Sequence, residues 1–412
     1  MTSQVELRVY FINSELKTVL RLFLGIFILM ANGLAQSDEP PVNWKNLPDP
    51  FHTASSNNGP RVIARPPGAK LKVPSGFQVD EYLSGFYRPR FMLYGPGGEI
   101  IMTDIGDWRR ANGTVYVLKD KQRKKILQDL DRPYGMVLHK GWLYVAEPTS
   151  VKRYKYNSQT MSVSSSEEII SLPGFGRGHI TRTLLFDRQG EKLYVSIGSE
   201  TNVDVGEPPM RATITRFNTD GSEPEIFASG LRNVVGMRWY PESDNLWATV
   251  QERDYLGDDL VPDYLVNVKK GGFYGWPYAY IGPHPEPRHK GLRPDMIEKT
   301  LYPDVLLGAH VAALDALFYT GKQFPGEYQG GCFIAFHGSW NRSKRAGYRV
   351  AFIPFRDGRP LSDPQDFLTG WMLGEDKREV WGRPVGLLQM TDGSLLISED
   401  GNGTLWRVSY RR

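Results

Sequence analysis

A six-fold repetition of one hairpin pattern limits what this chain can fold into. Each copy reads as an apolar strand, a turn that contains Gly or Asp, and a second apolar strand that ends in a small or acidic residue. No hairpin of this kind can bury both of its faces alone, so neighbouring copies must cover one another. The copies are FMLYGPGGEIIMTD from Phe91, GMVLHKGWLYVAE from Gly135, TLLFDRQGEKLYVSI from Thr183, GMRWYPESDNLWATV from Gly236, LFYTGKQFPGEYQGGCFIAF from Leu317 and GLLQMTDGSLLISED from Gly386.

Further strands follow most of the hairpins and complete the repeating unit. Units of up to four strands, repeated along one chain, predict an all-β fold, a six-bladed β-propeller. The strand GFQVDEYLSG from Gly76 lies outside the repeat, and we expect it to complete the last blade and so join the chain ends. A pair of stacked β-sandwich domains is the alternative. The outer strands read GTVYVLKD from Gly113, VKRYKY from Val151, ATITRFN from Ala212, RVAFIPF from Arg349 and TLWRVSY from Thr404.

The N-terminal 75 residues differ in character from the repeats. The apolar run LFLGIFILM, residues 22–30, is too short to span a bilayer, follows basic residues and precedes a small-residue ending at Ala35. This pattern predicts a signal peptide over residues 1–35 and a periplasmic protein, with an uncleaved N-terminal membrane anchor as the alternative. A Pro-rich extension over 36–75 and the propeller domain over 76–412 would follow.

Charge and cysteine content narrow the function classes. The formal net charge of +4 is small for 412 residues, and the basic residues form no single long run, so we expect no nucleic-acid partner. An exported chain leaves the reducing cytosol, yet the lone Cys332 cannot form an internal disulfide. Stability must then come from the core or from bound ions.

Polar side chains stand directly before the first strand of every hairpin. Because the first strands of propeller blades line a central channel, residues at these places share one face and should converge. A ring of like charges, partly removed from water, is destabilising unless an anion compensates it, so the ring predicts a polyanionic ligand. The alternative is that these side chains only bond neighbouring carbonyls. The members are Arg88, Arg132, His179, Arg232 with Asn233, His310 and Arg383.

The loops after the returning strands are long and polar. One of them carries Asp254, Asp258, Asp259 and Asp263, hard oxygen donors that suit Ca²⁺ better than Zn²⁺ or iron. The spacing lacks the pattern of an EF-hand, and a solvated acidic loop is the alternative for each carboxylate. His179, His310 and His337 lie far apart in the sequence and lack the short His-x-His spacing of a zinc site.

Several of these stretches resemble one family of enzymes. The segments GHITRTLLF, FASGLRN, ERDYLGDDLVPDYL, GGFYGWP, FHGSWNRS and VWGRPVGLLQ resemble the sorbosone dehydrogenase group, relatives of soluble glucose and aldose sugar dehydrogenases that depend on pyrroloquinoline quinone (PQQ). The resemblance covers residues 76–410. It implies a six-bladed propeller, Ca²⁺, and a cofactor whose three carboxylates are the polyanion that the ring requires.

The resemblance also implies roles for single residues. His179 would be the general base that takes the substrate's hydroxyl proton while hydride passes to the quinone, and Arg232 would polarise the accepting quinone oxygen. The backbone carbonyls of Glu252 and Arg253 would ligate Ca²⁺. Further contacts to the cofactor are expected from Asn233, Gln251, His310, Arg342 and Arg383.

The implied function is oxidation of an aldose, an aldehyde or a sugar-like alcohol, with electrons leaving to a periplasmic cytochrome or quinone; association into a homodimer is left open. Ile180 and Thr181 follow His179 as in the sorbosone branch, which argues against glucose as the substrate. A Ca²⁺-dependent propeller lactonase is one alternative, but it would need carboxylates at the channel mouth to hold the metal. A non-catalytic recognition propeller is the other.

Overall fold

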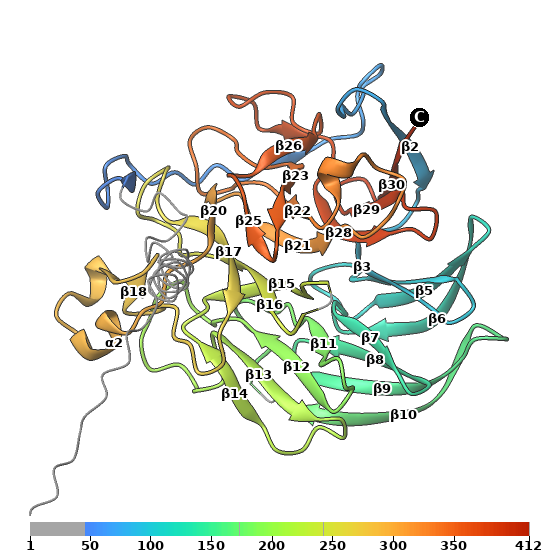
Figure 1. Cartoon of the computed structure of the whole chain (residues 1–412), viewed down its shortest axis with the longest axis horizontal. Coiled ribbons are helices and arrows are strands. Elements are labelled where there is room, and N and C mark those ends of the chain that lie inside the picture. The colour runs from blue at the N-terminus through green and yellow to red at the C-terminus, as the bar shows by residue number, and fades with distance from the viewer. Residues whose placement is uncertain (1–45, 173, 242, 412) are drawn as a thin grey trace, which may run out of the picture. The chain divides into compact units, whose positions relative to one another are not determined.

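Figure 1 shows the computed structural model of the chain, which describes residues 46–172, 174–241 and 243–411. Six four-stranded antiparallel sheets follow one another along the chain, so the predicted six-bladed β-propeller is confirmed. The innermost strands of neighbouring sheets contact one another, and the contact of β28 with β3 closes the ring. In the part of the chain that the structure describes, no helix is long and apolar enough to cross a membrane.

Each sheet is called a blade and numbered in chain order. Blades one to three consist of β3 (Pro89–Tyr94), β4 (Ile100–Asp104), β5 (Gly113–Lys119) and β6 (Gln122–Leu130); β7 (Met136–His139), β8 (Trp142–Glu147), β9 (Ser150–Asn157) and β10 (Ser162–Ser171); and β11 (Leu184–Phe186), β12 (Lys192–Ile197), β13 (Thr213–Asn218) and β14 (Glu225–Ser229). Blades four and five consist of β15 (Asn233–Trp239), β16 (Leu246–Gln251), β17 (Pro262–Val268) and β20 (Val305–Ala309); and β21 (Ala313–Phe318), β22 (Cys332–Phe336), β23 (Arg349–Ile353) and β26 (Gln365–Leu368).

Blade six joins the two ends of the described chain. It consists of β28 (Pro384–Gln389), β29 (Leu395–Glu399), β30 (Thr404–Tyr410) and, as its outermost strand, β2 (Phe77–Leu83). β2 lies beside β30 in Figure 1 and pairs antiparallel with it. Phe77 lies opposite Tyr410 in this pairing. The strand expected to lie outside the repeat therefore completes the last blade, as predicted.

The remaining elements connect or cover the blades. A segment between β17 and β20 carries β18 (Ala279–Tyr280), β19 (His284–Pro285), the 3-10 helix η3 (Pro287–His289) and the helix α2 (Pro294–Glu298). The short strand β1 (Arg61–Val62) of the Pro-rich segment pairs in parallel with β27 (Glu379–Val380) before blade six. Blade five also carries η4 (Gly326–Tyr328) and the hairpin of β24 (Phe355–Arg356) and β25 (Arg359–Pro360).

The residues that recur in the hairpins explain how the blades pack around the axis. A Cβ on Gly236 would lie 2.6 Å from the Leu314 carbonyl oxygen, and a Cβ on Gly386 would lie 2.3 Å from that of Arg90. Only glycine lets the first strand of one blade approach the next this closely. The hydroxyl of Ser398, in the second strand of blade six, donates to the same Arg90 carbonyl in blade one and links the two blades.

Aromatic packing holds β2 on the closing blade. The Phe77 ring makes edge contacts with Phe324, Phe367 and Tyr410 at centroid distances of 4.8, 5.1 and 4.9 Å. Phe77→Ala should lower the free energy of unfolding by about 2–3 kcal/mol, less than the 3–5 kcal/mol typical of a fully buried ring, since Phe77 is only partly buried. Urea unfolding measures the change. Phe51→Ala, at a ring that is 59% exposed, is the control, and an equal loss in both variants would contradict this role for β2.

Candidate active site

A cavity of about 680 Å³ opens where the first strands of the blades begin. All six blades contribute to its wall through residues at the start of, or just before, their first strands, so the propeller brings together positions that are far apart in the sequence. These residues are Arg90, Arg132, His179, Asn233, Ala312 and Arg383. Residues at the ends of the returning strands or in the loops after them complete the wall, among them Trp108, Gln251, His337 and Trp340.

His179 presents an unprotonated nitrogen to this cavity. Its Nδ1 lies 2.9 Å from the Ser199 carbonyl oxygen, which can only accept, so Nδ1 carries the proton and donates it. The Ser199 hydroxyl lies 3.0 Å from the same nitrogen and donates to the Thr201 carbonyl. In the neutral imidazole the lone pair is therefore on Nε2, the nitrogen that a proton acceptor would use.

Burial and charge keep this imidazole neutral. Burial lowers the pKa of His179 most, and the positive charge of Arg232 lowers it further, to about 3. The free base is therefore the main species throughout the neutral range. We expect no loss of activity from protonation of His179 near pH 6.5, where an ordinary histidine titrates.

The Arg232 charge gives a testable pH effect. In the wild type the charge of Arg232 disfavours the protonated form of His179. The variant Arg232→Met lacks this charge, so the pKa of His179 should rise toward its ordinary value, by about one unit or more. NMR titration of the His179 Cε1–H signal in the ligand-free protein measures the shift. Arg356→Met, at an exposed arginine of β24, should leave the signal unchanged. A downward shift in Arg232→Met would contradict the electrostatic explanation.

Two buried arginines fix the loop that carries His179. Arg182 is completely buried, and its Nη1 and Nη2 donate to the carbonyls of His179 at 2.7 Å and Phe175 at 2.8 Å. The guanidinium of Arg211 lies over the Phe175 ring, 4.4 Å from its centroid. Arg182 is therefore a structural residue that stiffens the approach to β11 and sets the position of His179.

Arg232 does not line the cavity. Its side chain is buried, and its guanidinium donates to the Glu252 carbonyl at 2.6 Å, to the Asn202 carbonyl at 3.0 Å and to the Asp254 carboxylate at 3.1 Å. These bonds hold it against the loop after β16. Its influence on the cavity in this structure is the positive charge that it places near His179.

Asn233 and Gln251 form a short chain of amides in the cavity wall. Asn233 Nδ2 donates to Gln251 Oε1 at 3.0 Å, and Gln251 Nε2 donates to the Ala313 carbonyl at 3.2 Å. Asn233 Oδ1 is buried and has no hydrogen-bond partner among the described residues. A buried acceptor without a partner is costly, so it is a place where a bound group would be stabilised.

Glu252 and Arg253 follow Gln251 and are both buried. Burial raises the pKa of the Glu252 carboxyl to about 8, and its Oε1 has no hydrogen-bond partner among the described residues. The Arg253 guanidinium pairs with Glu286 of η3's N-cap at 3.0 Å, with both side chains almost fully buried. The segment between β17 and β20 thereby anchors the backbone that the sequence assigned to Ca²⁺.

Two of the predicted cofactor contacts lie outside the cavity. His310 Nε2 donates to the Gly257 carbonyl at 2.9 Å, and its Nδ1 lies 3.5 Å from Asp254. Arg342 lines a different cleft, where it pairs with Asp259 at 2.7 Å. Both side chains stabilise the loop after β16, and the structure does not bring either of them into the wall around His179.

The acidic loop is not a carboxylate cluster. Asp254 pairs with Arg232, and Asp258 accepts a hydrogen bond from the Ser343 backbone. Asp263 lies in β17, where its carboxylate accepts from the backbone N–H groups of Glu252 and Ala313. Over residues 46–411 apart from 173 and 242, no three His, Cys, Asp or Glu side chains are grouped closely enough to hold a metal ion by themselves.

Sequence reasoning missed several residues of the wall. It chose Arg88, whose guanidinium bonds the Gly106 carbonyl, whereas Arg90, two residues later, reaches the cavity. It also missed Trp108, His337 and Trp340. These three follow returning strands, and because the end of a second strand lies beside the start of the first, their positions could have been found by the same rule that located His179.

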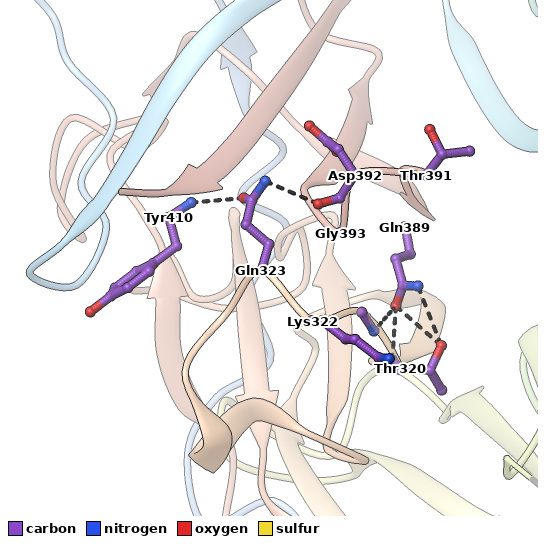
Figure 2. Close-up of a pocket in the computed structure, with 9 residues that line it drawn as sticks. Thr320, Lys322, Gln323, Gln389, Thr391, Asp392, Gly393 and Tyr410 are labelled. Atoms are coloured by element: carbon purple, nitrogen blue, oxygen red, sulfur yellow. Dashed lines mark hydrogen bonds between the residues drawn. The ribbon is translucent and has the colours of Figure 1, made fainter. Parts of the chain in front are cut away.

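A second cavity, of about 660 Å³, lies between the hairpin turns of blades five and six. Its polar groups bond one another: Gln389 Oε1 accepts from the backbone N–H groups of Thr320 and Gly321. Figure 2 shows that Gln323 bridges the Tyr410 N–H and the Asp392 carbonyl. It contains none of the predicted site residues. The cavity around His179 is therefore the stronger candidate.

Comparison with known proteins places the chain in a family. The TrAA12-like family model matches residues 71–263 and 296–411. An uncharacterized protein of Borreliella burgdorferi is 30% identical over 362 residues, covering 83% of this chain and 91% of that protein. The PQQ-dependent pyranose dehydrogenase of Coprinopsis cinerea is 24% identical over 418 residues, covering 83% of this chain but 55% of the enzyme, so the chain spans about half of its length.

Solved structures show the same fold. The calcium structure of the Trichoderma reesei family AA12 enzyme superposes with a TM-score of 0.72 at 22% identity, covering 86% of this chain and 100% of that chain. The holo PQQ domain of the Coprinopsis cinerea enzyme gives a TM-score of 0.68 at 21% identity, covering 84% and 98%. The chain belongs to the TrAA12-like family, and its expected kinship with PQQ-dependent sugar dehydrogenases is confirmed.

Proposed function

We propose that this chain is a PQQ- and Ca²⁺-dependent dehydrogenase that oxidises a sugar, an aldehyde or a sugar-like alcohol in the periplasm. The observation that carries the proposal is the juxtaposition, in one cavity, of a neutral imidazole with its Nε2 unprotonated and several guanidinium groups. The neutral imidazole can accept the proton of a substrate hydroxyl, and the guanidinium groups can bind an anionic cofactor.

The cavity wall fits the carboxylates of PQQ. Four arginines contribute to it: Arg90, Arg132, Arg177 and Arg383. Arg90 and Arg132 are each paired with an aspartate, whereas no described carboxylate lies within ion-pair distance of Arg383. A planar, carboxylated ligand would meet guanidinium groups able to bind it in a bidentate manner.

The oxygens around Glu252 fit a calcium ion. Buried oxygens without partners, Asn233 Oδ1 and Glu252 Oε1, are hard donors of the kind that Ca²⁺ prefers. The Glu252 carbonyl already accepts from Arg232, so it can offer a cation only its second lone pair. In the proposed holoenzyme the backbone carbonyls of Glu252 and Arg253 would hold the ion, and the ion pair of Arg253 with Glu286 would keep them in place.

The chain's own residues would carry the substrate half of the reaction. PQQ, when bound, supplies the quinone that accepts a hydride. His179 Nε2 accepts the proton of the substrate hydroxyl, and Ser199 holds the ring in the tautomer that makes this possible. The nearby charge of Arg232 opposes protonation of His179 before substrate arrives. Trp108 and Trp340 give the cavity aromatic walls on which a sugar ring can pack.

Reconstitution tests the proposal. Purified protein is mixed with PQQ and CaCl₂, and a shift of the quinone spectrum together with dye reduction on a panel of aldoses, aldehydes and alcohols is the expected result. A shifted spectrum without dye reduction on any substrate would favour a recognition propeller. Failure to bind PQQ, with hydrolysis of lactones, would favour the lactonase.

The periplasmic location rests on the N-terminal sequence, which lies outside the described residues. Export can be tested by fusing residues 1–35 to alkaline phosphatase, which becomes active only outside the reducing cytosol. Activity of the fusion, with cleavage near Ala35 in mass spectrometry, is the expected result. An active fusion of uncleaved mass would favour the N-terminal anchor.

A further inference from the structure

A second histidine in the cavity wall, His337, is held by a buried carboxylate. Its Nε2 lies 2.8 Å from Asp400 Oδ1, and 13% of its side chain and 6% of that of Asp400 are exposed. His337 comes directly after β22, and Asp400 directly after β29, so the pair bridges blades five and six at the mouth of the channel. Neither residue belongs to the proton-transfer step assigned to His179.

The hydrogen bonding fixes the tautomer of His337. Asp400 is ionised: burial acts to raise its pKa, but the charges of Arg90 and Arg383 and the hydrogen bond from His337 together hold it below its usual range. An ionised carboxylate only accepts, so His337 Nε2 carries the proton. The lone pair of the neutral ring is then on Nδ1, which no described residue bonds, in a side chain that lines the cavity.

The charged groups around His337 come from four elements. Asp400 is shared with Arg90 of β3 through a buried ion pair, and Arg383, just before β28, donates to the His337 carbonyl at 3.2 Å. Tyr348, just before β23, lies under the Arg383 guanidinium, 5.8 Å from it. Two guanidiniums and one carboxylate leave this corner with a net positive charge, which disfavours a further cation.

An anionic ligand would remove that obstacle. Burial lowers the pKa of His337 most, and Arg383 lowers it further, to about 4, so the ring is neutral at neutral pH. A ligand carboxylate drawn to Arg383 and Arg90 would cancel part of their charge, while Asp400 already stands where it stabilises imidazolium. The same ligand would present an acceptor to His337 Nδ1, a hydrogen bond that only the protonated ring can donate.

We propose that the His337–Asp400 pair takes up one proton when a carboxylate ligand enters the cavity, and that His337 then donates a hydrogen bond to that ligand through Nδ1. The proton comes from solvent, so ligand binding and proton binding are linked and each strengthens the other. The proposal rests on the proposed function only in taking PQQ as the natural ligand. It gives the cavity wall a proton donor in addition to the proton acceptor His179.

Calorimetry tests the proposal directly. The ligand-free protein is titrated at pH 6–8 with PQQ and, separately, with benzene-1,3,5-tricarboxylate, in phosphate and in Bis-Tris, whose ionisation enthalpies differ. The dependence of the binding enthalpy on buffer gives the protons taken up, with an expected value of about one per ligand in the lower part of this range. Because protonation favours binding, the affinity should fall by up to about tenfold per pH unit as pH rises through the pKa of the bound state.

Matched variants assign the proton. His337→Gln should abolish proton uptake and make the affinity independent of pH, Asp400→Asn should reduce uptake, and His179→Gln should leave it intact. If His337→Gln does not fold, the NMR shift of His337 Cε1–H in the wild type, with and without the tricarboxylate, gives its protonation state instead. Uptake that persists in His337→Gln, or is lost in His179→Gln, would overturn the proposal.

The two ligands separate this proposal from the proposed function. Binding of PQQ without proton uptake would overturn the proton site and leave the dehydrogenase intact. Binding of the tricarboxylate with uptake, but no binding of PQQ, would support the proton site and count against the dehydrogenase. Binding of neither ligand would count against both.

Discussion

Replacing His179 by Gln is expected to lower kcat by about 10²–10⁴-fold, the usual contribution of a general base, while PQQ binding changes little. The reason is geometric: the unprotonated Nε2 is the atom that would receive the substrate proton, and Ser199 rather than the cofactor holds the ring. Steady-state dye reduction gives kcat, and titration of the quinone spectrum gives the Kd for PQQ.

The matched control for this variant is His52→Gln, at an exposed histidine of the N-terminal segment that contacts no part of the cavity wall. It should retain wild-type kcat and Kd. Full activity in His179→Gln would remove His179 from the mechanism. Equal losses of kcat and of PQQ affinity would assign it to cofactor binding instead.

Replacing Arg383 by Leu should have its main effect on the cofactor. Its guanidinium donates to the carbonyls of His337 and Gly338 at 3.2 and 3.3 Å, near the long limit for hydrogen bonds, and no described carboxylate lies within ion-pair distance of it. Loss of such a charged partner typically costs about 2–5 kcal/mol of binding free energy, so the Kd for PQQ should rise by about 30- to 5,000-fold.

Two further variants sharpen this test, again by titration of the quinone spectrum. Arg383→Lys keeps the charge but loses the planar fork, so its affinity should fall between those of the wild type and Arg383→Leu. Arg356→Leu removes an exposed arginine of β24 outside the cavity and should bind PQQ normally. Unchanged affinity in Arg383→Leu would show that the carboxylates bind elsewhere.

The fold was predictable from the repeat, because no hairpin can bury both of its faces alone and each must be covered by its neighbours. The sequence also predicted that β2 completes the last blade, because it was the one strand that lay outside the repeat. The third strand of blade four was missed, since β17 begins at Pro262 inside a stretch whose aspartates suggested a loop. Asp263 lies in that strand because its carboxylate satisfies the backbone N–H groups of Glu252 and Ala313, long-range partners that no local pattern reveals.

The site was predictable only as far as strand register determines it. Position before a first strand located His179, Asn233 and Arg383 in one cavity. It could not tell that Arg232 turns toward Asn202 and Asp254, or that Arg342 pairs with Asp259, because these choices depend on loops that meet only in the folded chain. Arg88 and Arg90 have the same local pattern. Arg88 bonds the Gly106 carbonyl, whereas Arg90 pairs with the distant Asp400, a partner that no local pattern reveals.

The composite sixth blade has a consequence for biosynthesis. β2 emerges from the ribosome early, but its partner β30 is among the last segments to be made, so β2 waits with an unpaired edge while the other blades form. Ring closure is then a late, non-local step, and such steps are slow and leave apolar surface exposed in the meantime. A nascent chain that stalls before Thr404 would lack β30, and the unpaired β2 and β29 would be exposed to chaperones and proteases.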